Sequence, residues 1–349
     1  MKKQLLFSAM LAASLMATAQ VPFSYKEGES SLVYALPRTE LCIQVETEKV
    51  IQKPGMFYQY SERYLATKDI ITDEKTSYRL ISVRVKPRAI PDPKRTFALS
   101  PSKKSQASHL TVNAQGILCG VNTSCESVRK DAAPVLVLPI DNSKAAALLP
   151  LGEEYMMAGS TAKLAEGAAK QIYRIRESRM SLLTADVERL PADGASFSAM
   201  LDGLNKQERK LTELFVGSTT TEIQTQTVYL TPTTAVANDV VFRLSALNGL
   251  VSSEDLSGTP YYISIQPTPI QSVQTDFKAN KENTTIYTIL PASTQVSIGD
   301  GKSTFFSEQF LVPQFGVIIP LSEELLKKPK VKIRIDQQTG RLLGIADSL

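Results

Sequence analysis

Apolar and polar residues alternate in short runs over two long parts of the chain, residues 31–121 and residues 218–349. In the segment LCIQV, for example, Leu41, Ile43 and Val45 fall on one face. A period of two is typical of half-buried β-strands. In the second part, Gly, Pro, Asn or Asp bound most of these runs, which is typical of an antiparallel sandwich or open barrel.

Three details of the first part predict local structure. In LISVRV, the alternation places Ile81, Val83 and Val85 on one face. The segment KPGMFYQYSERYLA (53–66) interrupts the alternation, and its pattern after proline predicts a short helix. The segment KPRAIPDPKR (86–95) contains three prolines, so we expect a loop or an edge crossing there.

The two β regions each contain a strand–glycine–strand pattern of the form Gly-x-Leu-x-Gly-[Val/Ile]. It occupies residues 116–121 and 340–345. Glycine supplies the positive φ that a tight hairpin needs. Either the chain contains a duplication or two hairpins resemble each other by chance, and the sequence leaves both interpretations open.

Between the β regions, the period changes to that of helices. Apolar residues recur at helical spacing from Leu164 to Leu190, where Pro191 ends the pattern. Asp193 is expected to cap a second helix that Gly217 ends. The sequence therefore predicts an αα-hairpin with a short turn.

Two charged residues interrupt the apolar stripes of these helices. At about 100° per residue, Arg179 falls within the stripe of the first helix and Glu208 within that of the second. If the helices are antiparallel about the turn, these two residues face each other. The same register joins three apolar pairs: Leu190 with Phe197, Leu183 with Leu204, and Ile172 with Phe215.

We therefore predict a structural ion pair between Arg179 and Glu208. The competing interpretation is an anion site, which would need further cations on the same face. Arg174 points to the other side, where it would face solvent or a partner, and Arg176 lies on the flank.

The three cysteines are Cys42, Cys119 and Cys125. Cys119 and Cys125 bracket the short segment GVNTS, which a disulfide could close in an oxidising compartment. Buried, reduced cysteines are the alternative. CxxC spacing is absent and the chain has one histidine, so no zinc site is expected.

The first twenty residues have the pattern of an export signal. Lys2 and Lys3 precede a short apolar run, and Ala17 and Ala19 give a small-x-small cleavage pattern. We expect cleavage after Ala19. No cysteine that could carry a lipid follows the apolar run, and no later segment has an apolar run long enough to span a membrane. The formal net charge of +4 does not indicate a nucleic-acid-binding surface.

The candidate catalytic signals are weak. IGDGKS (298–303) ends like a phosphate-binding loop, but Val296 stands where its first glycine is required, and Asp300-Gly301 fits a hairpin turn. His109 is the only histidine, and no GxSxG motif accompanies it. The adjacent pairs Glu153–Glu154 and Glu323–Glu324 diverge on a helix or strand, so neither forms an acid/base dyad. No catalytic, cofactor-binding or metal-binding residue is therefore assigned.

Three segments resemble a family of exported Bacteroidales proteins catalogued only as a domain of unknown function. They are YSERYLATKDIITDEKT (60–76), IYRIRESRMSLLTADVERLPADG (172–194) and VPQFGVIIPLSEE (312–324). The resemblance covers nearly the whole chain after residue 19. It implies a Gram-negative cell-envelope setting and brings no activity, cofactor or catalytic residue.

Together these patterns predict an α+β, mainly β fold, with two antiparallel β modules of sandwich or open-barrel type joined by a long αα-hairpin. The expected divisions are residues 1–19 (signal peptide), 20–150 (N-terminal β domain), 151–217 (helical hairpin) and 218–349 (C-terminal β domain). The expected function is that of a non-catalytic scaffold or assembly component, in the periplasm or peripherally on the outer membrane. Its expected partners are other envelope proteins. A periplasmic glycan-binding protein or hydrolase with an unrecognised site is the alternative.

Overall fold

The computed structural model describes residues 32–99, 110–125, 159–186, 193–270, 285–322 and 331–347. The predicted signal peptide, His109, Leu190, Pro191 and the division at residue 150 lie outside these residues.

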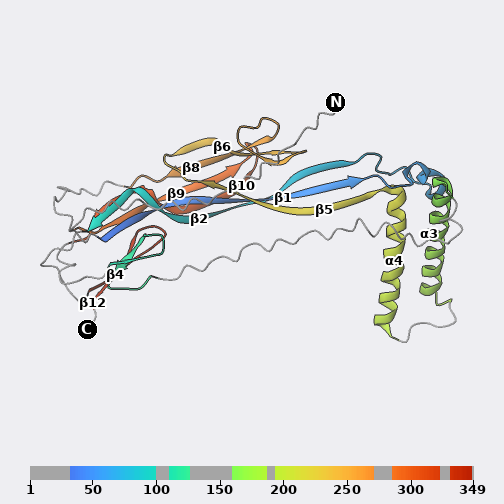
Figure 1. The fold of residues 1–349 in the computed structure, drawn as a ribbon, viewed down its shortest axis with the longest axis horizontal. Coiled ribbons are helices and arrows are strands. Elements are labelled where there is room, and N and C mark those ends of the chain that lie inside the picture. Colours follow the sequence, from blue (N-terminus) through green and yellow to red (C-terminus); the bar gives the residue numbers. More distant parts are fainter. Residues whose placement is uncertain are drawn as a thin grey trace, which may run out of the picture.

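The described residues form a mainly β protein with two long helices (Figure 1). The elements of the N-terminal part are β1 (Leu32–Lys53), η1 (Tyr58–Tyr60), α1 (Ser61–Leu65), β2 (Lys75–Leu99), β3 (Leu110–Val112) and β4 (Leu118–Val121). The helices α3 (Thr161–Leu183) and α4 (Gly194–Val216) follow. The remaining strands are β5 (Ser218–Leu230), β6 (Val236–Ser245), β7 (Gly249–Val251), β8 (Thr259–Pro267), β9 (Tyr287–Gly299), β10 (Thr304–Pro320), β11 (Val331–Ile335) and β12 (Leu342–Asp347).

The strands form three antiparallel sheets with the orders β2-β1-β5, β10-β9-β8-β6-β7 and β12-β11-β4-β3. Two of these sheets combine strands from before and after the helices. The predicted division into two separate β modules is therefore wrong. The hydrophobic alternation along the chain identifies strands but does not identify their partners, because strand pairing is a long-range property.

One hydrophobic core lies between the three-stranded and the five-stranded sheet. Leu41, Ile43 and Val45 of β1 are completely buried, as the alternation predicts, and contact buried side chains of β6, β8 and β9, which include Phe242 and Ile263. The two β regions thus share this core, which explains why they do not form independent units.

A second core lies beside the four-stranded sheet, where the two glycine-turn hairpins meet. β4 of the first hairpin pairs with β11 of the second. The two turns are built similarly: Gly116 (φ 81°) lies three residues after Asn113, and Gly340 (φ 70°) lies four residues after Asp336. The Asn113 side chain accepts hydrogen bonds from two backbone N–H groups of its turn, and the Asp336 side chain accepts one. The positive φ that the pattern predicted is present at both glycines.

A β-bulge changes which side chains of β2 point inward. Glu46 pairs with Ser82 and the next residue, Thr47, pairs with Leu80, so Ile81 has no partner in the register. Val83 and Val85 are buried as predicted, whereas Ile81 is 46% exposed and Leu80 contacts the core in its place. The expected inward position of Ile81 is wrong because a bulge shifts the alternation by one residue.

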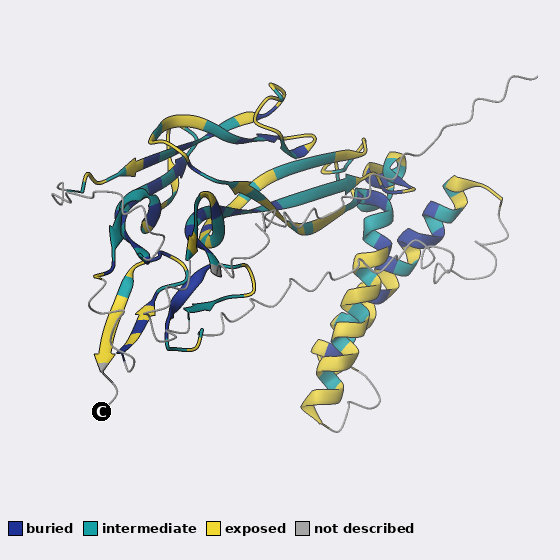
Figure 2. Cartoon of the chain, turned by 60° about the vertical axis from the view of Figure 1, so that its left-hand side comes forward, coloured by how far each residue is buried: buried dark blue, intermediate teal, exposed yellow. Residues whose placement is uncertain are grey.

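The three-stranded sheet extends well beyond the other two sheets, and the two long helices lie at its far end (Figure 1). Figure 2 shows that burial is concentrated where the sheets lie together and where the helices meet the end of this sheet. We call α3 and α4 together the helix pair, and the place where they meet the sheet the junction.

Candidate interaction surface on the helix pair

The helix pair is attached to the sheet directly through α4. Asp193 caps the N-terminus of α4, as predicted, by accepting a hydrogen bond from the backbone N–H of Ser196. Gly217 (φ 93°) ends the helix, and β5 begins at the next residue. Because β5 pairs with β1 along its whole length, the position of α4 is tied to the sheet.

At the junction, the carbonyl oxygens of the last four residues of α4 all accept hydrogen bonds. Such groups at the C-terminus of a helix usually have no partner within the helix itself. The Gly217 N–H donates to the carbonyl oxygen of Glu213. The remaining three bonds come from the segment between β1 and β2: Phe57 N–H to Leu214 O (2.6 Å), Ser61 Oγ to Phe215 O (2.8 Å) and Ile71 N–H to Val216 O (2.8 Å). This segment contains the predicted short helix, observed as η1 and α1, and it clamps the end of α4.

A third core holds the helices to each other near the junction. α3 contributes small side chains, Ala165, Ala168 and Ala169, which allow the helices to approach closely. Phe215 of α4 and Phe57 of the clamping segment are completely buried against them, with ring centroids 5.4 Å apart. Ile172 and Phe215 belong to this same core, in agreement with their predicted register.

Farther from the junction, Glu208 lies between two arginines of α3. It forms ion pairs with Arg179 and with the Nε of Arg176 (2.6 Å). Arg179 also donates to the side-chain oxygen of Asn205 at 3.0 Å. The side chain of Glu208 is 14% exposed, against 33% for Arg179 and 43% for Arg176. The structure thus brings together Arg179 and Glu208 and adds Arg176, which sequence reasoning left on the flank.

The environment of Glu208 keeps it ionised. Partial burial favours the neutral carboxyl group, but the hydrogen bond from Arg176 and the charges of Arg179 and Arg176 outweigh this effect and lower the pKa of Glu208. An ionised carboxylate has no proton to donate, and a lowered pKa together with two engaged oxygens makes it a weak base. The cluster therefore joins the two helices and shows no sign of an acid or base catalyst.

A cavity of about 430 Å³ opens beside this cluster, and its lining includes Arg176, Arg179 and Glu208. Arg209 and Glu213, which pair with each other, also line it, so two carboxylates offset two of its three cations. This balance weakens the competing interpretation of this face as an anion site.

The outer surface of the helix pair exposes large apolar side chains. Met180, Leu183 and Met200 are 62%, 59% and 46% exposed. Leu183 was expected to lie inward, opposite Leu204. The buried residue is instead Leu182, one residue earlier and about 100° away on the helix. Arg174 is exposed, as predicted, on α3.

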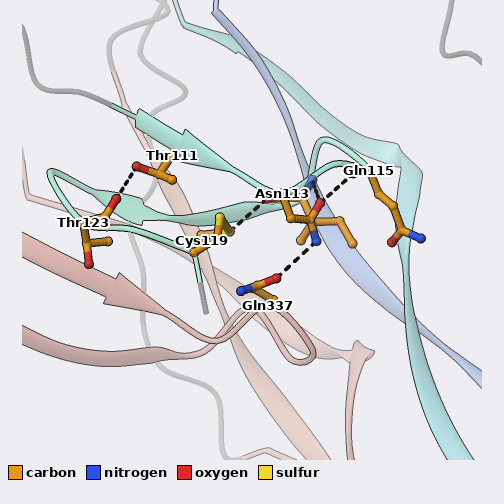
Figure 3. Close-up of a disulfide and its surroundings, with 8 residues drawn as sticks. Thr111, Asn113, Gln115, Cys119, Thr123 and Gln337 are labelled. Carbon is orange, nitrogen blue, oxygen red and sulfur yellow. Dashed lines mark hydrogen bonds between the residues drawn. A yellow bond between two sulfur atoms is a disulfide. The ribbon is translucent and has the colours of Figure 1, made fainter. Parts of the chain in front are cut away.

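Cys119 and Cys125 form a disulfide that closes the short loop after β4 (Figure 3). Cys119 is buried, and beside it the Asn113 side-chain amide donates a hydrogen bond to the side-chain oxygen of Gln337, which joins the two hairpins. The remaining cysteine, Cys42, is a free thiol on β1 whose pKa burial raises, although the charge of Arg88 opposes this effect. A raised pKa makes Cys42 a poor nucleophile.

The turn between β9 and β10 is the predicted hairpin turn at Asp300-Gly301. The Asp300 carboxylate accepts hydrogen bonds from the N–H groups of Lys302 (2.8 Å) and Ser303 (2.7 Å), which therefore do not point at a phosphate. These bonds lower the pKa of Asp300. A cavity of about 380 Å³ lies beside this turn and is lined mainly by hydroxyl and amide side chains, with Tyr262 at one wall.

In the described part of the chain, no three His, Cys, Asp or Glu side chains converge as metal ligands. Within the same residues, neither long helix has an apolar stretch sufficient to cross a membrane.

The fold and the surface define a mainly β protein that carries a helix pair at the end of an extended three-stranded sheet. The chain belongs to the family described as a domain of unknown function (DUF4831), whose model matches residues 30–343. No curated protein and no solved structure matches it.

Proposed function

We propose that this protein is an exported, non-catalytic component of the Bacteroidales cell envelope that acts through protein–protein contacts. One observation carries the proposal: the helix pair lies at the end of the extended sheet and exposes Met180, Leu183 and Met200 on its outer surface. Met180 and Leu183 belong to α3 and Met200 to α4. Large apolar side chains exposed on neighbouring elements are typical of protein interaction sites. In this proposal the sheets form a sandwich-like base and α3–α4 form an αα-hairpin that contacts the partner.

Arg174 supports this assignment. It is exposed on α3, and among the described residues it forms no ion pair. Arg174 lies six residues before Met180, about 120° away around α3. Arginine is enriched in interfaces, where lysine is depleted. The partner expected for this surface is another envelope protein with an apolar, acidic-rimmed site.

The test is affinity purification of the full chain from native envelopes after cross-linking. A variant with Met180→Glu, Leu183→Glu and Met200→Glu should lose the proteins that the wild type recovers. The matched control carries Leu247→Glu and Leu256→Glu, which replace side chains that are 68% and 82% exposed. Both lie on the part of the molecule that the three sheets form, which we call the β body. If both variants recover the same proteins as the wild type, the helix pair is not the interaction surface.

Export is tested separately by N-terminal sequencing of the protein from cell fractions. The expected mature N-terminus is Gln20, and the expected fraction is the periplasm or the peripheral outer-membrane fraction. An intact Met1 on cytoplasmic protein would remove the envelope setting from the proposal.

The cavity beside Asp300 favours a second candidate function, glycan binding. Asn238, Ser264 and Ser297 offer amide and hydroxyl groups, and Tyr262 offers an aromatic face on which a sugar ring can stack. Calorimetric titration with envelope oligosaccharides should then give binding that Tyr262→Ala abolishes. Equal titration curves for the wild type and this variant would exclude the cavity as the glycan site.

A further inference from the structure

The two edges of the three-stranded sheet differ in a way that bears on association. β2, at one edge, contains Pro87, Pro91 and Pro93, which cannot donate backbone hydrogen bonds. It also contains a series of cations: Lys75, Arg79, Arg84, Lys86, Arg88, Lys94 and Arg95. Prolines and long cationic side chains are the usual protection of an edge strand against pairing with another chain.

β5, at the opposite edge, has no such protection. Its sequence STTTEIQTQTVYL has no proline, lysine or arginine, and Glu222 is its only charged residue. Within the described residues, β5 pairs with β1 alone, along all thirteen of its residues. Its outer edge therefore presents a row of backbone N–H and C=O groups that only another extended strand can pair in regular order.

Most of the other sheet edges in the described part of the chain are short, and the long edge strand β10 is covered at its middle; β12 has six residues. β3 and β7 have three residues each. In β10, the Arg95 guanidinium donates to the carbonyl oxygens of Pro313 (2.9 Å) and Gln314 (3.2 Å). The Gln314 side chain bonds in turn to the backbone of Thr39. β5 is therefore the long edge strand of the three-stranded sheet whose sequence permits pairing. Residues 304–312 of β10 also lack proline, lysine and arginine, but they belong to the edge of the other large sheet.

We propose that β5 pairs antiparallel with β5 of a second copy of this chain, so that two three-stranded sheets become one continuous six-stranded sheet. A second copy fits because its strand matches β5 in length and in polar, β-branched composition. Glu222 is the only charged residue of β5. In a symmetric pair whose centre is another residue, Glu222 therefore does not face Glu222 of the copy, and no like charges lie opposite each other.

The side chains select a register centred on Thr225. Residues of β5 with odd numbers share the outward face of the sheet, because Tyr229 pairs with the outward-facing Cys42 of β1. With Thr225 opposite itself, the exposed Ile223 faces Thr227 of the copy, and Tyr229 faces Thr221. Aromatic and β-branched pairs of this kind are favourable across strands. Glu222 then faces Val228 and not its own copy.

Disulfide cross-linking in the full chain tests the pairing directly, in a Cys42→Ser background. Thr225→Cys should cross-link to itself, because directly opposed residues of antiparallel strands have Cα atoms about 4.5–5.5 Å apart. Ile223→Cys alone should not cross-link, since its copy lies about 14 Å away. Mixing chains with Ile223→Cys and chains with Thr227→Cys should restore the cross-link.

Sedimentation velocity over a concentration series measures the association itself. The double variant Thr221→Lys and Thr225→Lys should raise the dimer dissociation constant at least about tenfold, because it adds the protection that β2 already has and places two lysines opposite each other. The control variant Thr233→Lys and Thr234→Lys makes the same charge change in the exposed loop after β5 and should leave the constant within about twofold.

Two results would overturn the proposal. One is a chain that stays monomeric up to about 0.1 mM and forms no Thr225→Cys cross-link. The other is a dimer whose dissociation constant is the same in the wild type and in the β5 double variant, since that dimer would use another surface. Urea unfolding of each variant at monomeric concentration separates lost association from lost folding. The proposal does not depend on the partner of the helix pair, so either can fail alone.

Discussion

Glu208 shows how one side chain can connect two helices without forming a catalytic site. Its carboxylate is largely buried between Arg176 and Arg179. The stability of such a cluster depends on which member is removed. Without Arg179, the carboxylate keeps Arg176 as a partner, whereas without Glu208 two neighbouring cations lose their shared counter-ion.

We predict that Glu208→Leu lowers the free energy of unfolding by about 2 kcal/mol and that Arg179→Leu lowers it by about 1 kcal/mol. Hydrogen bonds to charged groups contribute stability of this order, and the partial exposure of both arginines limits the loss. The double variant should lose less than the sum. Urea unfolding of the four proteins measures the coupling. Arg209→Leu, which breaks an exposed pair with Glu213, is the control and should cost less than ~0.5 kcal/mol. Strictly additive losses would show that Arg179 and Glu208 do not interact.

The lowered pKa of Glu208 predicts a pH dependence with a definite sign. A carboxyl group whose pKa is lower in the folded chain than in the unfolded chain, where it is about 4.3, stabilises the fold above that value. The contribution is lost as the pH falls through the folded-state pKa. The difference in unfolding free energy between the wild type and Glu208→Gln should therefore shrink from about pH 6 to about pH 3. A difference that grows toward acid would refute this assignment.

At the scale of elements, the junction determines how the helices meet the sheet. Every carbonyl group in the last turn of α4 has a partner, and three of the four partners come from the segment between β1 and β2. Gly55 lies so close to the backbone of Leu214 that no Cβ atom fits between them. The glycine is thus required by the close approach of two backbones, which cannot move apart as a flexible side chain can.

Gly55→Ala should therefore destabilise the protein by about 2 kcal/mol, the order of cost for overpacking a buried site. The matched control is Gly203→Ala in α4, where an added Cβ atom meets nothing within 4 Å. That change should stabilise the helix by up to about 1 kcal/mol, because alanine is the better helix former. Urea unfolding monitored by circular dichroism distinguishes the two, and equal effects would mean that the junction is not closely packed.

At the scale of the whole molecule, local patterns in the sequence were enough to predict most strands, helices, caps and turns. Residues 86–95, where the three prolines predicted a loop or an edge crossing, instead continue β2 along the edge of its sheet. Asp193, Gly217 and the Asp300-Gly301 turn are where local chemistry requires them. The pairing of Arg179 with Glu208 also followed from helical spacing. Local patterns could not predict that the two β regions share sheets, or that a bulge occurs at Ile81. Both features depend on pairing partners that are distant in the sequence. Arg176 was missed because a long flanking side chain can still reach an inward-facing carboxylate.

The separation of the cores predicts that the helix pair and the β body open independently. The core of the helix pair shares no residue with the two cores of the sheets. Within α4, no residue from 194 to 210 is fully buried, whereas Leu211 and Phe215 beside the junction are. Segments with few buried contacts exchange their amide hydrogens through local opening of low free energy.

Hydrogen exchange followed by mass spectrometry should therefore show three levels of protection. Peptides from residues 194–210 should exchange first, and those from residues 211–216, which the junction clamps, should follow. Peptides that contain Ile43 or Ile263 should exchange last, with an opening free energy at least ~2 kcal/mol above that of residues 194–210. Uniform protection across these peptides would contradict the prediction. It would mean that the extended sheet transmits the stability of the β body to the outer end of the helices, so that the whole chain opens as one cooperative unit.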